Sequence, residues 1–185
     1  MPISHSAGDT ADLGSAIPAR EKLELLYQSV CSQFGAGLVR LASSYESVAD
    51  ARQDLLQEIH LALWQALPRF RGECSLRTFV YRVAHNRGLT HVWRRRPEVP
   101  LSAACPEIGD ERPSPESAAI SNAGQASLLR AIRRLPVAYR QVITMALEEL
   151  PQAEIAAVLG ITENNVAVRL NRARKLLGQE LGGKR

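Results

Sequence analysis

This chain has few cysteines, few aromatic residues and no long apolar run. Its three cysteines, Cys31, Cys74 and Cys105, are odd in number and far apart, so the sequence predicts neither a disulfide framework nor a zinc site. Aromatic residues make up only 5% of the 185 residues, which favours small helical units packed by aliphatic side chains. No stretch is long enough to span a membrane. We expect a cytoplasmic chain without membrane insertion, beginning with a flexible leader at residues 1–20.

The residue patterns that carry enzyme chemistry are also missing. His60, His85 and His91 have no metal-ligand spacing with the cysteines, and we expect each to be a surface or half-buried residue. There is no glycine-rich phosphate loop and no triad-like arrangement. The sequence therefore predicts a protein that is not an enzyme and has no metal or cofactor.

Positive charge is concentrated in one segment. The chain has 23 lysines and arginines against 19 acidic residues, a formal net charge of +4. Between Arg69 and Arg96, however, the only acidic residue is Glu73, and aromatic side chains interleave with the arginines. A solvated surface is the plain alternative for any charged run. This density of arginine and aromatic residues is more typical of contact with phosphates and bases.

The segment before this basic run predicts an amphipathic helix. Large apolar residues recur at four-residue steps: Leu55, Ile59, Leu63 and Leu67. Asp54, Gln57 and Glu58 share another, solvated face. After Pro68 a second helix is expected, capped by Ser75. With the helical pattern that begins at Glu21, which Gly35 and Gly37 are expected to loosen or break, these helices predict a bundle over residues 21–96.

Residues 97–124 change character and predict a linker. They contain five prolines among serine, alanine and glycine, and their charges are mostly acidic. An ordinary solvated tether is the interpretation that the sequence alone favours. A second helical unit follows at residues 125–181.

The second unit has the form of a helix-turn-helix. An amphipathic helix is predicted after Pro136, with its apolar face at Tyr139, Val142, Ile143, Ala146, Leu147 and Leu150. A short helix then ends at Gly160, and Thr162 is expected to cap a longer one. In that longer helix the core side is predicted to be Val166, Leu170, Ala173 and Leu177.

The opposite side of this last helix is a predicted surface for contacting bases. At 100° per residue it carries Asn164, Val168, Asn171 and Lys175, flanked by Asn165, Ala167 and Arg172. Asparagine can bond an adenine edge bidentately, and valine can touch a thymine methyl group. Arg169, Arg172, Arg174 and Lys175 would add phosphate contacts.

The stretch from Asp54 to Asn86 reads DLLQEIHLALWQALPRFRGECSLRTFVYRVAHN. It resembles the core-binding and promoter-melting segment of bacterial sigma factors of the extracytoplasmic-function (ECF) group, whose pattern is approximately DLVQEVFLRAWRALPRFRG followed by RTWLYRIARN. The last helix resembles the module of the same family that binds the minus-thirty-five element and usually ends close to GTVKSRLHRAR. This chain has NNVAVRLNRAR there, so Ala167 and Asn171 depart from the family. Thr90 stands where the family often has Asp, and Pro151 where it often has a capping Ser.

The resemblance implies a set of partners and contact residues. The partners are core RNA polymerase, through its beta-prime and beta subunits, promoter DNA, and an anti-sigma factor that no residue here identifies. Core binding falls on Asp54, Gln57 and Glu58. Minus-ten contacts fall on Phe70, Arg71, Arg77, Tyr81, Arg82, Asn86, Arg94 and Arg95. Minus-thirty-five contacts fall on Asn164, Asn165, Val168, Arg169, Asn171, Arg172 and Lys175. A pocket bordered by Phe70, Tyr81 and Asn86 would hold a flipped base, whereas Phe79 belongs to packing.

The expected fold is therefore all-α, with two small helical domains joined by a flexible linker. The function that the resemblance implies is promoter-specific transcription initiation with core polymerase. Two other interpretations stay open at this point: a stand-alone helix-turn-helix regulator, and a sigma-like decoy that only binds an anti-sigma protein.

Overall fold

The computed structural model describes residues 19–95 and 121–182, and the regular secondary structure of these ranges is entirely helical. The first range contains α1 (Ala19–Tyr45), α2 (Ala49–Ala66), the short 3-10 helix η1 (Leu67–Arg69) and α3 (Leu76–Arg94). The second contains α4 (Ser121–Arg134), α5 (Val137–Leu147), α6 (Gln152–Leu159) and α7 (Glu163–Gly182). The all-α prediction is confirmed. Within these ranges, no helix combines the length and apolar character needed to cross a membrane.

In the N-terminal unit, α1, α2 and α3 pack against one another. The predicted leucine stripe is the buried face of α2 and η1, since Leu55, Ile59 and Leu63 are fully buried and Leu67 nearly so. Ser75 caps α3 as predicted, because its Oγ accepts a hydrogen bond from the backbone N–H of Thr78 at 3.0 Å. The cap fixes where the basic helix begins after the loop.

The expected break in the first helix is wrong. The single helix α1 runs through Gly35 and Gly37 without interruption. A glycine inside a helix costs about 1 kcal/mol relative to alanine, and burial on both sides offsets that cost here. Val30, Leu38 and Leu41 are fully buried, so tertiary packing keeps the helix continuous.

In the C-terminal unit, α6 and α7 form the predicted helix-turn-helix. Gly160 ends α6 in the left-handed conformation, with φ of 65°, and Thr162 Oγ1 accepts a hydrogen bond from Asn165 N at 3.3 Å. The core register of α7 is confirmed, since its buried residues are Val166, Leu170, Ala173 and Leu177.

The prediction for α5 is partly wrong. Leu147 was expected on the apolar face, but it is 52% exposed, whereas Leu150 is buried beyond the end of the helix. The chain reverses after Leu147: Leu150 N–H bonds to Met145 O and Glu149 N–H to Ala146 O, the pattern of a Schellman motif. This reversal folds Leu150 back under the helix.

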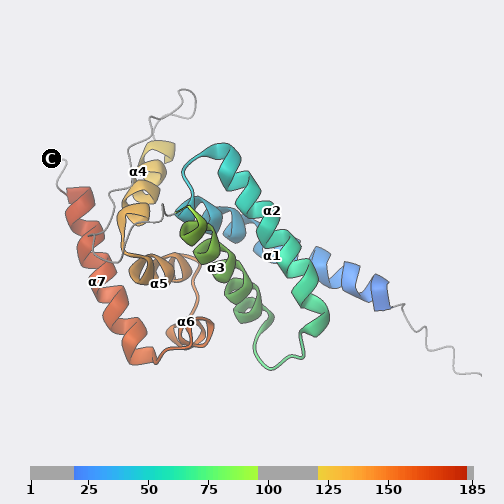
Figure 1. The fold of residues 1–185 in the computed structure, drawn as a ribbon. Helices are drawn as coiled ribbons and strands as arrows, with labels where there is room; N and C mark the ends of the chain where they lie inside the picture. Colours follow the sequence, from blue (N-terminus) through green and yellow to red (C-terminus); the bar gives the residue numbers. More distant parts are fainter. Residues whose placement is uncertain (1–18, 96–120, 183–185) are drawn as a thin grey trace, which may run out of the picture.

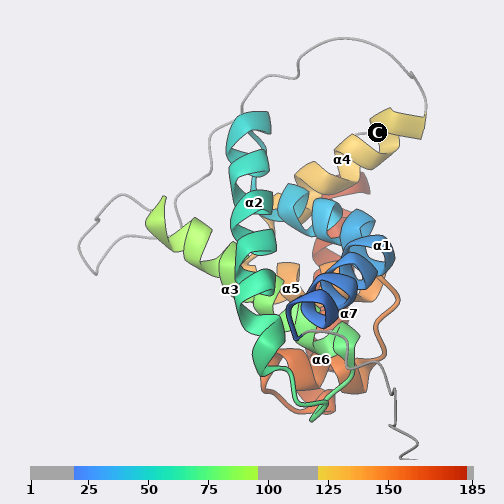
Figure 2. The ribbon, with the colours of Figure 1, turned by 90° about the vertical axis from the view of Figure 1, so that its right-hand side faces the viewer.

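The two units lie against each other, with α4–α7 beside α1 and α3 (Figures 1 and 2). Helix α1 contacts α4 and α5, and α3 contacts α6. Buried apolar side chains of both units form one cluster. The leader up to residue 18 and the linker up to residue 120 lie outside the described residues. Residues 121–124, assigned to the linker from the sequence, are the start of α4.

Candidate nucleic-acid interface

Helix α7 presents the predicted base-contacting side to solvent. Val168 is 43% exposed, and the polar side chains around it are exposed as well. The exposed members of the predicted set are Asn164, Asn165, Val168, Asn171, Arg172 and Lys175, whereas Arg169 is half-buried. Since the opposite face is buried, this polar face is the side of α7 that another molecule can contact.

The loop before α3 carries the first of the predicted minus-ten residues. Gly72 turns the loop with φ of 76°, a conformation that glycine adopts without strain. Arg71 is exposed, and the half-buried Phe70 packs its ring 5.0 Å from that of Phe79. Phe79 is partly buried against the core, as predicted.

Tyr81 does not face solvent together with Phe70 and Asn86. It is only 3% exposed, and its ring packs 6.3 Å from that of Phe34 in α1. Burial raises the pKa of the Tyr81 phenol, so the hydroxyl keeps its proton and donates to Glu148 Oε2 at 3.4 Å. Asn86 is exposed. In this conformation the three side chains therefore do not form one open pocket.

Four predicted arginines have partners within the chain. Arg77 donates to the backbone oxygen of Glu148, and Arg82 to that of Ala157 at 2.8 Å. At the other end of α3, Arg95 pairs with the buried carboxylate of Glu46. The fourth, Arg94, lies 3.5 Å from Glu58 in an exposed pair. Surface pairs of this kind contribute little stability, so Arg94 can exchange its partner easily.

The predicted core-binding face of α2 is accessible. Asp54 and Gln57 are exposed and Glu58 is half-exposed. Leu61, which the sequence reasoning missed, lies on the same face and is 57% exposed. A groove beside it is lined by Glu58, Leu61, Ala62, Gln65, Arg87 and Arg94. The sequence did contain a signal for Leu61. It does not belong to the buried leucine stripe, and it lies four residues after Gln57 and three after Glu58, which places it on their face of the helix.

One histidine expectation is wrong. His85 is 1% exposed, and its Nδ1 lies 2.9 Å from the hydroxyl of Tyr45. Burial lowers the pKa of His85 to about 3, so the ring is neutral near pH 7. His60 is half-buried, with Nδ1 3.0 Å from Tyr27 Oη, and burial lowers its pKa too. Among the described side chains, no three histidine, cysteine, aspartate or glutamate residues are grouped to hold a metal ion.

The two units match two models of one protein family. Sigma-70 region 2 matches residues 32–98, and Sigma-70 region 4 matches residues 125–177. The RNA polymerase sigma-H factor of Pseudomonas aeruginosa is 31% identical over 143 residues, covering 72% of this chain and 74% of that relative. The chain belongs to the sigma-70 family.

Further likenesses place this sigma factor in the ECF group. The ECF RNA polymerase sigma-E factor of Escherichia coli is 29% identical over 151 residues, covering 76% of this chain and 78% of the relative. The structure of CnrH in complex with the cytosolic domain of CnrY has a TM-score of 0.66 and 22% identity, covering 90% and 96% of the two chains. Sigma factor RpoE in complex with the anti-sigma factor NepR, from Bartonella quintana, has a TM-score of 0.60 and 20% identity, covering 90% and 98%. At these identities the two structures support the fold.

The sigma factor directs promoter-specific transcription initiation with core RNA polymerase. The match to region 2 covers most of the N-terminal unit, which a stand-alone helix-turn-helix regulator would not carry. That interpretation is therefore set aside.

Proposed function

We propose that this sigma factor divides initiation among three surfaces: the exposed face of α2 for core polymerase, the loop and arginine-rich side of α3 for the minus-ten element, and the exposed face of α7 for the minus-thirty-five element. The observation that carries the proposal is the two-sided character of α7. Its core side is buried through four residues, whereas the side with Asn164, Val168 and Asn171 is exposed.

On α7 the residue types divide into two roles. Asn164 and Asn171 carry amides that can bond base edges, and Val168 can contact a thymine methyl group. Arg172 and Lys175 are exposed cations that suit phosphates, which position the helix without reading sequence. Asn171 stands where relatives often have an aromatic residue or histidine, so we expect a promoter preference that differs from theirs.

On α2, Asp54, Gln57 and Glu58 supply polar contacts around the exposed Leu61. An apolar side chain surrounded by acidic groups is suited to docking on a basic, partly apolar surface of polymerase. On α3 and its loop, Arg71 and Asn86 are already exposed, whereas Tyr81 is buried and its hydroxyl bonds to Glu148 of the C-terminal unit. Full minus-ten contact therefore requires that the two units separate.

The test is transcription in vitro with core polymerase, this protein and a genomic template, followed by sequencing of the transcripts. We expect starts at a narrow set of promoters. Asn171→Ala should shift the preferred upstream sequence, because a bidentate contact discriminates by about 1–3 kcal/mol. Arg172→Ala should weaken all promoters alike and lower the salt dependence of binding. Equal, sequence-independent losses from both variants would contradict this division.

Core binding is tested by Asp54→Ala against Glu24→Ala. Both variants remove one negative charge from an exposed helix position. We expect Asp54→Ala alone to weaken co-purification with core polymerase. Equal affinities for the two variants would remove α2 from the docking surface.

An anti-sigma protein is a further proposed partner. The supporting observation is that one matched structure contains sigma factor RpoE with the anti-sigma factor NepR, and the other contains CnrH with the cytosolic domain of CnrY. A protein that co-purifies with this chain, and that blocks promoter-specific transcription when added back in pure form, would support the proposal. The proposal would be contradicted if the protein purifies without a partner and also directs transcription at full level in cells that have received no inducing signal. We place the protein in the cytoplasm with core polymerase, and assign it no catalytic activity of its own.

A further inference from the structure

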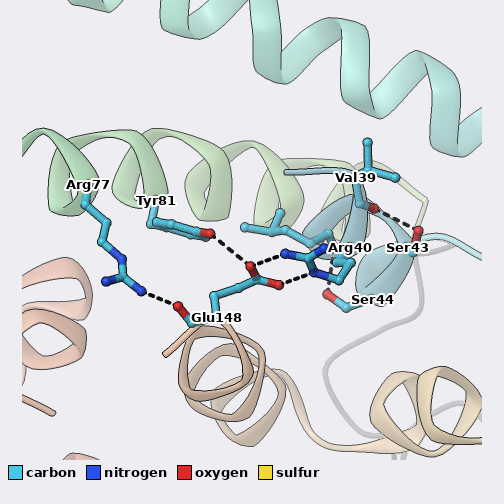
Figure 3. Close-up of polar contacts among 8 residues, drawn as sticks. Val39, Arg40, Ser43, Ser44, Arg77, Tyr81 and Glu148 are labelled. Carbon is cyan, nitrogen blue, oxygen red and sulfur yellow. Dashed lines mark hydrogen bonds and ion pairs between the residues drawn. The ribbon is translucent and has the colours of Figure 1, made fainter. Parts of the chain in front are cut away.

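Glu148, just after α5, bonds across the contact between the two units. Its carboxylate accepts two hydrogen bonds from Arg40 of α1, from Nε to Oε1 and from Nη2 to Oε2, both at 2.6 Å (Figure 3). The Tyr81 hydroxyl of α3 donates to the same carboxylate. Arg77 donates to the backbone oxygen of Glu148. One residue of the C-terminal unit thus bonds three side chains on two helices of the N-terminal unit.

The Glu148 side chain is held in place by the end of its own helix. The Schellman turn after Leu147 puts Glu149 in the left-handed conformation, with φ of 59°. A residue other than glycine is strained there, and such strain is found where the surrounding structure enforces it. The side chain of Glu148 is only 7% exposed, although it is charged. A buried carboxylate needs its partners, so loss of one of them weakens the whole contact.

Gly37 makes this close approach possible. A Cβ atom at Gly37 would lie 2.4 Å from the Tyr81 hydroxyl oxygen and 2.8 Å from Glu148 Oε2. Any other residue there would push the carboxylate away from α1. Gly35 lies two residues earlier in the same helix. A Cβ atom added there would meet nothing within 4 Å, so Gly35 provides a matched control.

Three residues that bond to the C-terminal unit belong to the set proposed for the minus-ten element. Tyr81 is buried and gives its hydroxyl hydrogen bond to Glu148, and Arg77 and Arg82 give hydrogen bonds to backbone oxygens of the C-terminal unit. Arginine binds carboxylates and phosphates through the same donors. The same groups therefore cannot bond the C-terminal unit and promoter DNA at once.

We propose that Glu148 is a latch that holds the C-terminal unit over the promoter-facing side of α3, so that its release must precede contact of Arg77, Tyr81 and Arg82 with DNA. The proposal rests on the minus-ten assignment made above. In the closed form the Glu148 carboxylate, the Glu148 backbone oxygen and the Ala157 backbone oxygen accept from the donors that we assign to the promoter strand in the open form. Core polymerase would favour the open form if it binds the two units at separate positions.

Glu148→Gln and Gly37→Ala test the latch by different means. The first keeps the shape of the side chain and removes its charge, and the second leaves every charge and displaces the carboxylate. Glu149→Gln matches the first in charge and lies at the next residue, which is exposed. Gly35→Ala matches the second in chemistry and lies in the same helix.

Two measurements are made on each full-length variant without polymerase. Small-angle X-ray scattering gives the radius of gyration, and fluorescence anisotropy gives the affinity for a fluorescein-labelled, single-stranded DNA of random sequence. Single-stranded DNA is used because a helix-turn-helix binds duplex DNA, so that binding of the single strand reports on α3 and its loop and not on α7. If the wild-type chain is closed in nine of ten molecules, opening raises the affinity about tenfold. We expect both latch variants to expand and to bind about tenfold more tightly, with both controls unchanged.

Each other outcome overturns the proposal in a recognisable way. Expansion without tighter binding means that the covered residues do not contact DNA, so the minus-ten assignment itself fails. No expansion in either variant means that Glu148 is not a latch, while the minus-ten assignment stands and is tested by transcription with Arg77→Ala. A wild-type chain that is already as extended as the variants also overturns the latch. Circular dichroism spectra with wild-type helix content establish that the variants are folded.

Discussion

At the scale of single residues, two glycines in long helices have opposite surroundings. A Cβ atom at Gly88 of α3 would lie 2.5 Å and 2.6 Å from ring carbons of Tyr45, whereas one at Gly35 would meet nothing within 4 Å. Gly88 thus allows α1 and α3 to approach closely, and Gly35 has no such role. The identity of the residue does not distinguish the two positions, but the neighbouring helix does.

We predict that Gly88→Ala lowers the free energy of unfolding by up to about 2 kcal/mol. Overpacking costs about 1–3 kcal/mol, and the better helix propensity of alanine returns about 1 kcal/mol. Gly35→Ala, which lacks the clash, should raise the free energy of unfolding by up to about 1 kcal/mol. Urea denaturation followed by circular dichroism measures both. Equal effects of the two substitutions would mean that Tyr45 moves aside freely.

His85 predicts a dependence of stability on pH. Burial lowers its pKa in the folded state to about 3, against an unfolded value of about 6.5. Below about pH 6.5 the unfolded chain binds a proton that the folded chain does not. This contribution to stability is therefore complete above pH 6.5 and is lost as the pH falls toward 3, by about 1.4 kcal/mol per pH unit.

The measurement is the free energy of unfolding from pH 7.5 to 4.5 for the wild type and for His85→Gln. The wild type should lose about 3 kcal/mol more than the variant over the two pH units below pH 6.5. Carboxylates that titrate in this range are common to both chains, so the difference isolates the histidine. Parallel curves would show that His85 becomes solvated or protonated in the folded state.

At the scale of elements, the ends of the helices decide where functional side chains lie. Ser75 caps α3 and thereby sets the phase of Arg77, Tyr81 and Arg82. The Schellman turn after α5 aims Glu148 at α1. In both cases a few hydrogen bonds at a helix end position a side chain whose partners lie far away in the sequence.

We predict that Ser75→Ala lowers the free energy of unfolding by about 1 kcal/mol, the usual cost of losing an N-cap. Ser75→Asn keeps a side-chain oxygen at the cap and should restore most of the loss. Thermal unfolding in the absence of DNA measures the effect on the fold alone. An asparagine variant as unstable as the alanine variant would mean that the bond to Thr78 N does not determine the start of α3.

At the scale of the whole molecule, the two units share one buried apolar cluster. Ion pairs and hydrogen bonds add to it between the units, including those from Arg40 and from Arg133, which donates to Ser43 O at 3.0 Å. Arg140 contributes from inside, with its guanidinium 5.8 Å from the centroid of the Tyr45 ring. The units are therefore coupled, although the family models match them separately.

We predict a single cooperative unfolding transition for the wild-type chain in differential scanning calorimetry. Domains that share a core unfold together, whereas independent ones unfold in separate steps. Gly37→Ala should divide the transition into two, because it weakens the contact between the units and leaves the packing among the helices of each unit in place. Two transitions in the wild type would show that the contact between the units adds too little free energy to couple them.

The sequence determined the features that depend on near neighbours along the chain. Helical periodicity located the buried faces of α2 and α7, and the residue types at Ser75, Gly160 and Thr162 predicted the caps and the turn. These predictions hold because residues a few positions apart have fixed angular relations in a helix. The assignment of each face to polymerase or DNA came from family resemblance and stays a prediction until the variants are measured.

Only the tertiary structure decided the features that join distant parts of the chain. Arg40 and Glu148 are 108 positions apart, and no local pattern relates them. The same holds for the burial of Tyr81 and His85, for the continuity of α1 through Gly37, and for the exposure of Leu147. Local pattern tells which side chains are apolar or charged, but packing decides which of them meet, because burial and charge pairing depend on what the rest of the fold brings alongside.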